Sequence, residues 1–408
     1  MHLQALVCSA LVALLVNADE LLERQTIVSD ILPFLGAAFS ETPEICLSNN
    51  NLSNFKILCR WDEECVKGQS GGDCSGFIAQ DVNQKKIITA FRGSVGKTQL
   101  LYQFEHQNRV VTFPLGGKVS FFYGTAFNKT FRSGIPFEIL RNASEDGSFE
   151  CLFYGYSLGA AMSSLAALTA SMETNCKSTR HIGMAQPRMA DMDFLKASNE
   201  FVTSSLRINQ LFDPIPAFPS PTAPNDGTIL IHSPKELFWC GTTHSNRSFE
   251  CDHLHQRCSE RFYAGGASNF LSIIANGCYH TTYFVENVEN WGTAGCHPSE
   301  VFPVTSEACY TDPDNAPTRH CPLVAGSWNG DKTPHVEVER SPDVQGEVRS
   351  KAGRWNGDKS PHVEVERSPD VQGEVRSKAG SWSGDKSPHV EVERSPDVQG
   401  EVRSKAEK

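Results

Sequence analysis

Residues 151–159 read Cys151-Leu152-Phe153-Tyr154-Gly155-Tyr156-Ser157-Leu158-Gly159. The first four residues form an apolar run that is typical of a strand buried on both faces of a sheet. From Leu158 to Met172, Ala and Ser dominate, which indicates a helix of small residues. A strand, a sharp turn and a helix in this order predict an α/β fold.

Three further short apolar runs extend this pattern to either side of the turn. They cover residues 86–91, 181–185 and 205–211, and turn residues bound each of them. Runs of this length suit strands better than helices. We therefore expect four strands of a buried sheet between residues 86 and 211.

The turn itself has the Gly-x-Ser-x-Gly form of a nucleophile elbow, with Ser157 between Gly155 and Gly159. Such a turn strains the serine backbone and exposes its hydroxyl, while the glycines let strand and helix approach each other. The serine would also lie at a helix N-terminus, where free amides favour developing negative charge. Because the motif follows a predicted strand, we interpret Ser157 as a nucleophile rather than as part of an ordinary Gly-Ser turn.

A serine nucleophile needs an acid and a histidine later in the chain. Asp213 is the candidate acid, since it ends a predicted strand and Pro214 fixes the following loop. The alternative is a simple turn aspartate before a proline. Several histidines follow, and spacing alone does not choose among His232, His244, His253, His255 and His280.

Composition narrows the class of protein. The chain has 408 residues and a formal net charge of -11, without a basic stretch, which disfavours a nucleic-acid binder. No internal apolar run approaches the roughly 20 residues that a transmembrane helix needs. The apolar run Leu3–Val16, which ends in Val16-Asn17-Ala18, predicts a signal peptide over residues 1–18 and a secreted protein. Four Asn-x-Ser/Thr sequons, at Asn51, Asn128, Asn142 and Asn246, agree with export and are candidate glycosylation sites.

Cysteine usage points to the same oxidising compartment. Removal of Cys8 with the signal leaves 13 of the 14 cysteines, an odd number, so at least one stays unpaired. Our candidate is Cys151, as a small buried strand residue. The cluster from Cys251 to Cys258 contains two histidines and could bind zinc, but disulfides are the better explanation, and we expect no metal.

The C-terminal end is a tandem repeat with a period of 27 residues. Its three units cover 326–352, 353–379 and 380–406, and all 24 Phe and 8 Tyr lie before them. Alternating segments such as Val336-Glu337-Val338-Glu339 could form strands, but little is available to pack against them. We expect residues 326–408 to be a flexible or disordered spacer. A repeated partner ligand and Ser-Pro modification sites are the alternatives. Residues 19–325 then form one globular domain.

Five blocks of this domain resemble the class 3 lipases, a family best known from fungal triacylglycerol lipases, and most of all the secreted lipase-like proteins of nematodes. The blocks are Ala90-Phe91-Arg92-Gly93-Ser94, Gly155-Tyr156-Ser157-Leu158-Gly159, Gln186-Pro187-Arg188, Asp213-Pro214-Ile215-Pro216 and His280-Thr281-Thr282-Tyr283-Phe284. The segment 232–239 also resembles the stretch before the family's catalytic histidine. The resemblance spans roughly residues 40–300 and includes neither the signal nor the repeats.

The resemblance implies an α/β-hydrolase fold, with a mostly parallel central sheet flanked by helices. It makes Ser157 the nucleophile, Asp213 the orienting acid and His280, rather than His253, the general base. Ser94 and the amide of Leu158 would form the oxyanion hole. The implied activity is hydrolysis of acylglycerols, the lipid or ester substrate being met at a lipid–water interface, without a cofactor. Phospholipids or short-chain esters are alternative substrates, and a catalytically inactive lipid- or partner-binding protein is the alternative of another class.

The chain departs from the family pattern at four positions. Tyr156 and Ala185 stand where His and Gly are usual, Ala160 replaces a Gly, and Tyr279 replaces an Asp. In this family a lid lies between the oxyanion strand and the elbow, where this chain has the apolar segments 100–104 and 110–114. These residues are expected to form either an amphipathic lid or an ordinary surface loop.

Overall fold

The computed structural model describes residues 24–65, 72–233, 235–239, 241–244, 248–251, 258 and 278–303, and six short strands between 336 and 406. The predicted signal, Asn246, His253 and His255 lie outside these residues. The chain divides into two compact units, Met1–Pro322 and Leu323–Lys408.

The first unit is built around an eight-stranded sheet in the order β1-β2-β3-β6-β7-β8-β9-β10. Strands β3, β6, β7, β8 and β9 are parallel, and the strands at both edges are antiparallel to their neighbours. The strands are β1 (Lys56–Glu64), β2 (Asp73–Asp81), β3 (Lys86–Phe91), β6 (Glu150–Tyr156), β7 (Ser178–Met184), β8 (Ser204–Gln210), β9 (Glu236–Trp239) and β10 (Ser248–Cys251). The four predicted strands are therefore neighbours at the centre of the sheet, and the predicted mostly parallel sheet is confirmed.

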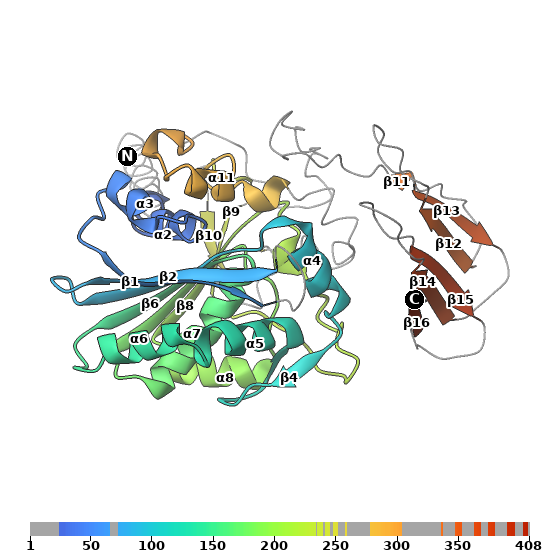
Figure 1. Ribbon diagram of the computed structural model, residues 1–408, viewed down its shortest axis with the longest axis horizontal. Coiled ribbons are helices and arrows are strands. Elements are labelled where there is room, and N and C mark those ends of the chain that lie inside the picture. Colours follow the sequence, from blue (N-terminus) through green and yellow to red (C-terminus); the bar gives the residue numbers. More distant parts are fainter. Residues whose placement is uncertain are drawn as a thin grey trace, which may run out of the picture. The chain divides into compact units, whose positions relative to one another are not determined.

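Helices cover both faces of this sheet (Figure 1). One face carries α5 (Phe121–Phe127), α6 (Ile135–Ala143), α7 (Leu158–Glu173) and α8 (Met192–Phe201). The other carries α2 (Leu32–Ala37), α3 (Pro43–Asn49) and α11 (Val288–Thr293). Strand β6 is a continuous apolar run because both of its faces are buried. Phe153 packs on the face that carries α7, and Leu152 and Tyr154 pack on the face that carries α2.

Helix α7 matches the predicted helix of small residues. Its first 13 residues are all buried, which Ala, Ser and Gly allow because they let the helix lie close to β6 and β7. Between β3 and the elbow, the chain also forms α4 (Gly96–Glu105) and a hairpin of β4 (Val110–Thr112) and β5 (Lys118–Ser120).

Four disulfides join pairs of described cysteines: Cys46–Cys296, Cys65–Cys74, Cys151–Cys176 and Cys251–Cys258. The expectation that Cys151 is unpaired was wrong. Cys176 lies just before β7, next to the start of β6, so the neighbouring strands bring the two sulfurs together in the interior. Burial marks a disulfide as readily as a free thiol. Cys251 and Cys258 bond each other and are therefore not thiolate ligands for zinc.

Among the described cysteines, Cys59 on β1 carries a free thiol. Burial, and then the charge of Glu63, raise the pKa of this thiol. A raised pKa keeps it protonated and a poor nucleophile.

The described residues of the second unit are strands in the order β11-β13-β12-β15-β14-β16. They are β11 (Val336–Glu337), β12 (Glu347–Ala352), β13 (Val363–Ser368), β14 (Glu374–Ala379), β15 (Val390–Ser395) and β16 (Arg403–Ala406). The end of one repeat pairs with the alternating segment of the next, and the register sets Arg349 opposite Glu366. The alternating segments of the sequence are thus the ones that pair.

Candidate active site

Ser157 occupies the turn between β6 and α7, with its backbone in the left-handed region at φ 54°. Its amide donates to the Met184 carbonyl at 2.9 Å. A Cβ on Gly155 would lie 2.1 Å from the Gly159 carbonyl oxygen, and one on Gly159 would lie 2.2 Å from that of Phe91. Only glycine fits at either position, so the spacing of the motif follows from the direct contact of strand, turn and helix.

The structure brings Ser157, His280 and Asp213 together in one hydrogen-bonded chain. His280 Nε2 lies 2.8 Å from Ser157 Oγ, and His280 Nδ1 lies 3.1 Å from each carboxylate oxygen of Asp213. The Asp213 side chain is fully buried and that of His280 is 16% exposed. This order of hydroxyl, imidazole and carboxylate is the arrangement that lets an imidazole take a proton from a serine.

Asp213 receives two further hydrogen bonds. The Ile215 amide donates to Oδ1 at 2.9 Å, because Pro214 starts the short helix η2 (Ile215–Ala217) directly after the aspartate. The Tyr283 hydroxyl donates to Oδ2 at 2.7 Å and accepts from the backbone amide of Gln210 at 3.2 Å. Burial, and then the negative charge of Asp213, raise the pKa of Tyr283 well above its usual value, so this phenol stays a donor.

The backbone around His280 is also held by side chains. Gln210, at the end of β8, donates to the carbonyls of Tyr279 and Thr282, each at 2.6 Å. Tyr156 donates to the carbonyl of His280. Sequence reasoning missed these supports. A polar residue that closes an apolar strand run, as Gln210 does, is the signal that could have pointed to one of them.

Two departures from the family pattern find a structural place. Tyr156, where His is usual, supplies the hydroxyl that holds the His280 carbonyl. Tyr279, where Asp is usual, packs its ring 5.1 Å from that of Phe212. Both substitutions therefore affect how the histidine segment is held rather than the three side chains themselves.

The predicted oxyanion residues lie beside the elbow. Ser94 is in the loop between β3 and α4, and its Oγ accepts from Gln103 Nε2 at 2.8 Å. A Cβ on Gly93 would lie 2.9 Å from the Tyr156 ring, which places this loop against the end of β6. Leu158 is the first residue of α7, so its amide has no acceptor within the helix.

Two of the other candidate histidines are engaged elsewhere. His232 is buried, and its Nε2 lies 2.6 Å from the Pro216 carbonyl. Burial, followed by the charges of Arg207 and Arg188, holds the pKa of His232 well below its usual value. The His244 ring lies 3.7 Å from that of Phe302. His253 and His255 fall outside the described residues.

The expected lid segment 100–104 lies within α4. Its Phe104 stacks on Phe218 at 5.7 Å between ring centroids, and Phe218 follows η2, the short helix next to Asp213. Helix α4 therefore connects the Ser94 loop to the loop that follows Asp213. The side chains of Leu100 and Leu101 lie outside the described part of the chain.

Comparisons with known proteins show which family the chain resembles. Residues 88–223 match the model of the family described as lipase (class 3), a segment that contains Ser94, Ser157 and Asp213. A lipase of Caenorhabditis elegans is 25% identical over 304 residues, which span 67% of this chain and 79% of that protein.

Solved structures show the same fold. The triacylglyceride lipase of Rhizomucor miehei superposes with a TM-score of 0.50 at 17% identity, over 66% of this chain and 96% of that one. The mono- and diacylglycerol lipase of Aspergillus oryzae superposes with a TM-score of 0.52 at 18% identity, over 64% and 97%. The predicted α/β-hydrolase fold is thereby confirmed.

Proposed function

Since the chain belongs to the class 3 lipase family and is a carboxylic-ester hydrolase, we propose that it is a secreted acylglycerol lipase acting through Ser157, Asp213 and His280. The observation that carries this proposal is the unbroken hydrogen-bonded chain from Ser157 Oγ through His280 to the buried Asp213. The strained elbow holds the serine, and two loops distant in sequence supply its partners.

The mechanism follows from these groups. His280 Nε2 takes the Ser157 proton as Oγ attacks the ester carbonyl carbon, which gives a tetrahedral intermediate. Asp213 fixes the imidazole orientation through Nδ1–H and stabilises the imidazolium that forms. His280 then protonates the leaving alcohol, and the acyl group stays on Ser157. A water molecule, deprotonated by His280, attacks this acyl-enzyme and releases the carboxylic acid.

Ser94 and Leu158 are the proposed donors to the oxyanion. Both amides belong to the region where the Ser94 loop meets the first turn of α7, and that helix N-terminus adds a favourable dipole. Loss of one oxyanion donor typically raises the barrier by about 3 kcal/mol. Neither residue exchanges a proton with the substrate.

Acylglycerols are the proposed substrates because the relatives are described as lipases of triacylglycerides or of mono- and diacylglycerols. The aromatic contact between α4 and the loop after Asp213 supports a cover over the site that opens at a lipid surface. Phospholipids and short-chain esters remain the alternative substrates. An inactive lipid-binding protein is the alternative that a lack of turnover would favour.

Secretion is proposed from three observations. Residues 1–18 have the pattern of a signal peptide. The four disulfides between described residues need an oxidising compartment. Asn51, Asn128 and Asn142 are exposed, as glycosylated asparagines must be. In the part of the chain that the structure describes, no helix has the length and apolarity to cross a bilayer.

The purified chain should be assayed on esters of graded acyl length, beside Ser157→Ala and His280→Ala. We expect each variant to lose at least about 10³-fold in kcat, since the groups of a triad act as a unit. His253→Ala, the rival base from the sequence, should retain turnover within about twofold, as it changes no interaction made in the transition state. Equal turnover by wild type and Ser157→Ala would refute the assignment of the nucleophile. A higher rate on long-chain emulsions than on soluble short esters would favour the lipase over the esterase.

A further inference from the structure

Both flanks of the loop that carries Ser94 are hydrogen-bonded to one backbone carbonyl, that of Asp73 at the start of β2. Upstream of Ser94, Arg92 Nη2 donates to this carbonyl at 2.5 Å. Downstream, Gln99 Nε2 donates to it at 2.7 Å. The position of the loop is therefore fixed on both sides by hydrogen bonds to the adjacent strand β2.

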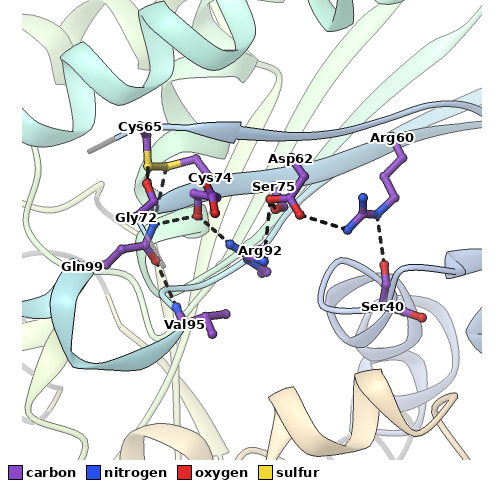
Figure 2. Close-up of polar contacts among 11 residues, drawn as sticks. Ser40, Arg60, Asp62, Cys65, Gly72, Cys74, Ser75, Arg92, Val95 and Gln99 are labelled. Carbon is purple, nitrogen blue, oxygen red and sulfur yellow. Dashed lines mark hydrogen bonds and ion pairs between the residues drawn. A yellow bond between two sulfur atoms is a disulfide. The ribbon is translucent and has the colours of Figure 1, made fainter. Parts of the chain in front are cut away.

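Gln99 makes the closer connection to the loop. Its side chain is fully buried, and its Oε1 accepts from the Val95 amide at 3.0 Å, one residue after Ser94. Its other end contacts Asp73 and lies 3.4 Å from the Cys65 sulfur. Both ends of the amide are thus used, one on the loop and one on β2, and the side chain acts as a strut between them (Figure 2).

The Cys65–Cys74 disulfide holds the strand end on which this strut rests. It joins β1 and β2 where the hairpin opens, and the register pairs Glu64 with Asp73 next to the bridge. Cross-linking two strands at this point limits how far the Asp73 carbonyl can move. The backbone carbonyl of Ser75, on the same strand, also accepts a hydrogen bond from the backbone amide of Arg92 at 2.9 Å.

The strut reaches the Ser94 hydroxyl by a second route. Gln103 Nε2 donates to Ser94 Oγ at 2.8 Å and to the Gln99 carbonyl at 3.1 Å. The Tyr123 hydroxyl of α5 donates to Gln103 Oε1 at 3.3 Å, which fixes the orientation of that amide. The backbone and the side chain of Gln99 therefore both contribute to where Ser94 lies.

We propose that Gln99 is a positioning residue for the oxyanion hole and that the Cys65–Cys74 disulfide is the frame on which it acts. The inference rests on the proposed function, since it presumes that Ser94 stabilises an oxyanion. Gln99 contacts neither Ser157 nor His280 and acts only through the loop. Donors to a developing charge must be held within about 0.5 Å of their productive position. Loss of the hydrogen bonds made by the Gln99 side chain should therefore lower kcat and leave substrate binding almost unchanged.

The test uses the full chain and a soluble p-nitrophenyl ester, with active sites counted by phosphonate titration. Gln99→Met keeps the side-chain volume and removes both polar ends, and we expect kcat to fall about 10- to 100-fold with KM within about threefold. Gln80→Met is the matched control: it makes the same substitution on β2, near the end of the strand that is far from Asp73, and should keep kcat within about twofold. The pair Cys65→Ala, Cys74→Ala should lower kcat by a smaller factor, about 3- to 10-fold, because the hydrogen bonds remain.

A triple variant that combines Gln99→Met with Cys65→Ala and Cys74→Ala tests whether the Gln99 side chain and the disulfide position Ser94 together or independently. If strut and disulfide act as one unit, the triple variant should be no more than about twofold slower than Gln99→Met alone. Effects that multiply would overturn the role given to the disulfide. A Gln99→Met enzyme with wild-type kcat would overturn the positioning role and leave the proposed function intact.

Hydrogen exchange provides a readout that does not depend on turnover. The Val95 amide should exchange faster in Gln99→Met than in wild type or Gln80→Met, because its acceptor is gone. A wild-type chain that hydrolyses no ester would refute the proposed function. Faster Val95 exchange would then still support the strut, and unchanged exchange would overturn it.

Discussion

Asp213 is a buried carboxylate, and an unpaired buried charge would be strongly unfavourable. Three donors compensate for its burial: the Ile215 amide, the Tyr283 hydroxyl and His280 Nδ1–H. These bonds also fix both carboxylate oxygens in space. The orientation of His280 therefore depends in part on the buried Tyr283 hydroxyl, through its hydrogen bond to Asp213.

Tyr283→Phe should remove one of these donors and leave the Gln210 amide without its acceptor. A hydrogen bond to a charged group contributes about 1.5 to 3 kcal/mol, so kcat should fall roughly 10- to 100-fold. Tyr154→Phe is the control, since this buried tyrosine on β6 packs its ring against that of Phe34. Steady-state kinetics on a soluble ester measures both. An unchanged kcat in Tyr283→Phe would mean that Asp213 holds its position without the phenol.

The site was predictable in part. Ser157 and Asp213 stand out because each sits at a local pattern, a glycine-flanked turn and a strand end before proline. Tyr283 and Gln210 do not, since their roles depend on contacts across 70 and 69 residues of chain. Choosing His280 among five histidines required the family resemblance. The catalytic roles of these residues stay predictions until they are measured.

At the scale of elements, the centre of the sheet could be predicted and its edges could not. The runs 86–91, 151–154, 181–185 and 205–211 became β3, β6, β7 and β8, because strands buried on both faces must be continuously apolar. Strand β1 mixes charged with apolar residues and is mostly exposed, so no long apolar run marks it. The Cys151–Cys176 disulfide was not predicted because the sequence does not show which cysteines lie close together in the fold.

Helix α7 rests on β7 through a buried histidine, which gives the elbow region a pH-dependent stability. His181 Nε2 lies 3.0 Å from Ser163 Oγ on α7, and Nδ1 lies 2.9 Å from Ser205 Oγ on β8. Burial lowers the pKa of His181 to about 4. In the unfolded chain this histidine binds a proton near its usual pKa, and in the folded protein it does not until much lower pH.

The stability contribution of neutral His181 is therefore fully present above about pH 6.5 and is lost as the pH falls toward 4. Urea unfolding of wild type and His181→Gln at several pH values measures it. The stability advantage of wild type should shrink by about 1.4 kcal/mol for each pH unit in this window. A difference that does not change with pH would show that His181 is not buried in its neutral form.

At the scale of the whole molecule, every residue assigned to the site belongs to the first unit, Met1–Pro322. The described strands of the repeats pair only with one another. The chemistry as proposed therefore uses residues of the first unit.

A chain that ends at Val324 should keep ester turnover within about threefold of the full chain, because Ser157, Asp213 and His280 all belong to the first unit. The measurement is kcat/KM on a soluble ester and on an emulsion for both chains. A large loss on the soluble ester would mean that the repeats support the catalytic unit. A loss confined to the emulsion would assign them a role in attachment to the lipid surface.

Covalent labelling with a fluorophosphonate, followed by peptide mass spectrometry, tests directly whether Ser157 is a nucleophile activated by His280. Such a reagent reacts with a serine that a neighbouring base has activated. We expect a single adduct on Ser157, absent in Ser157→Ala and much slower to form in His280→Ala. An adduct on a different serine, or labelling of Ser157 at an unchanged rate in His280→Ala, would contradict it.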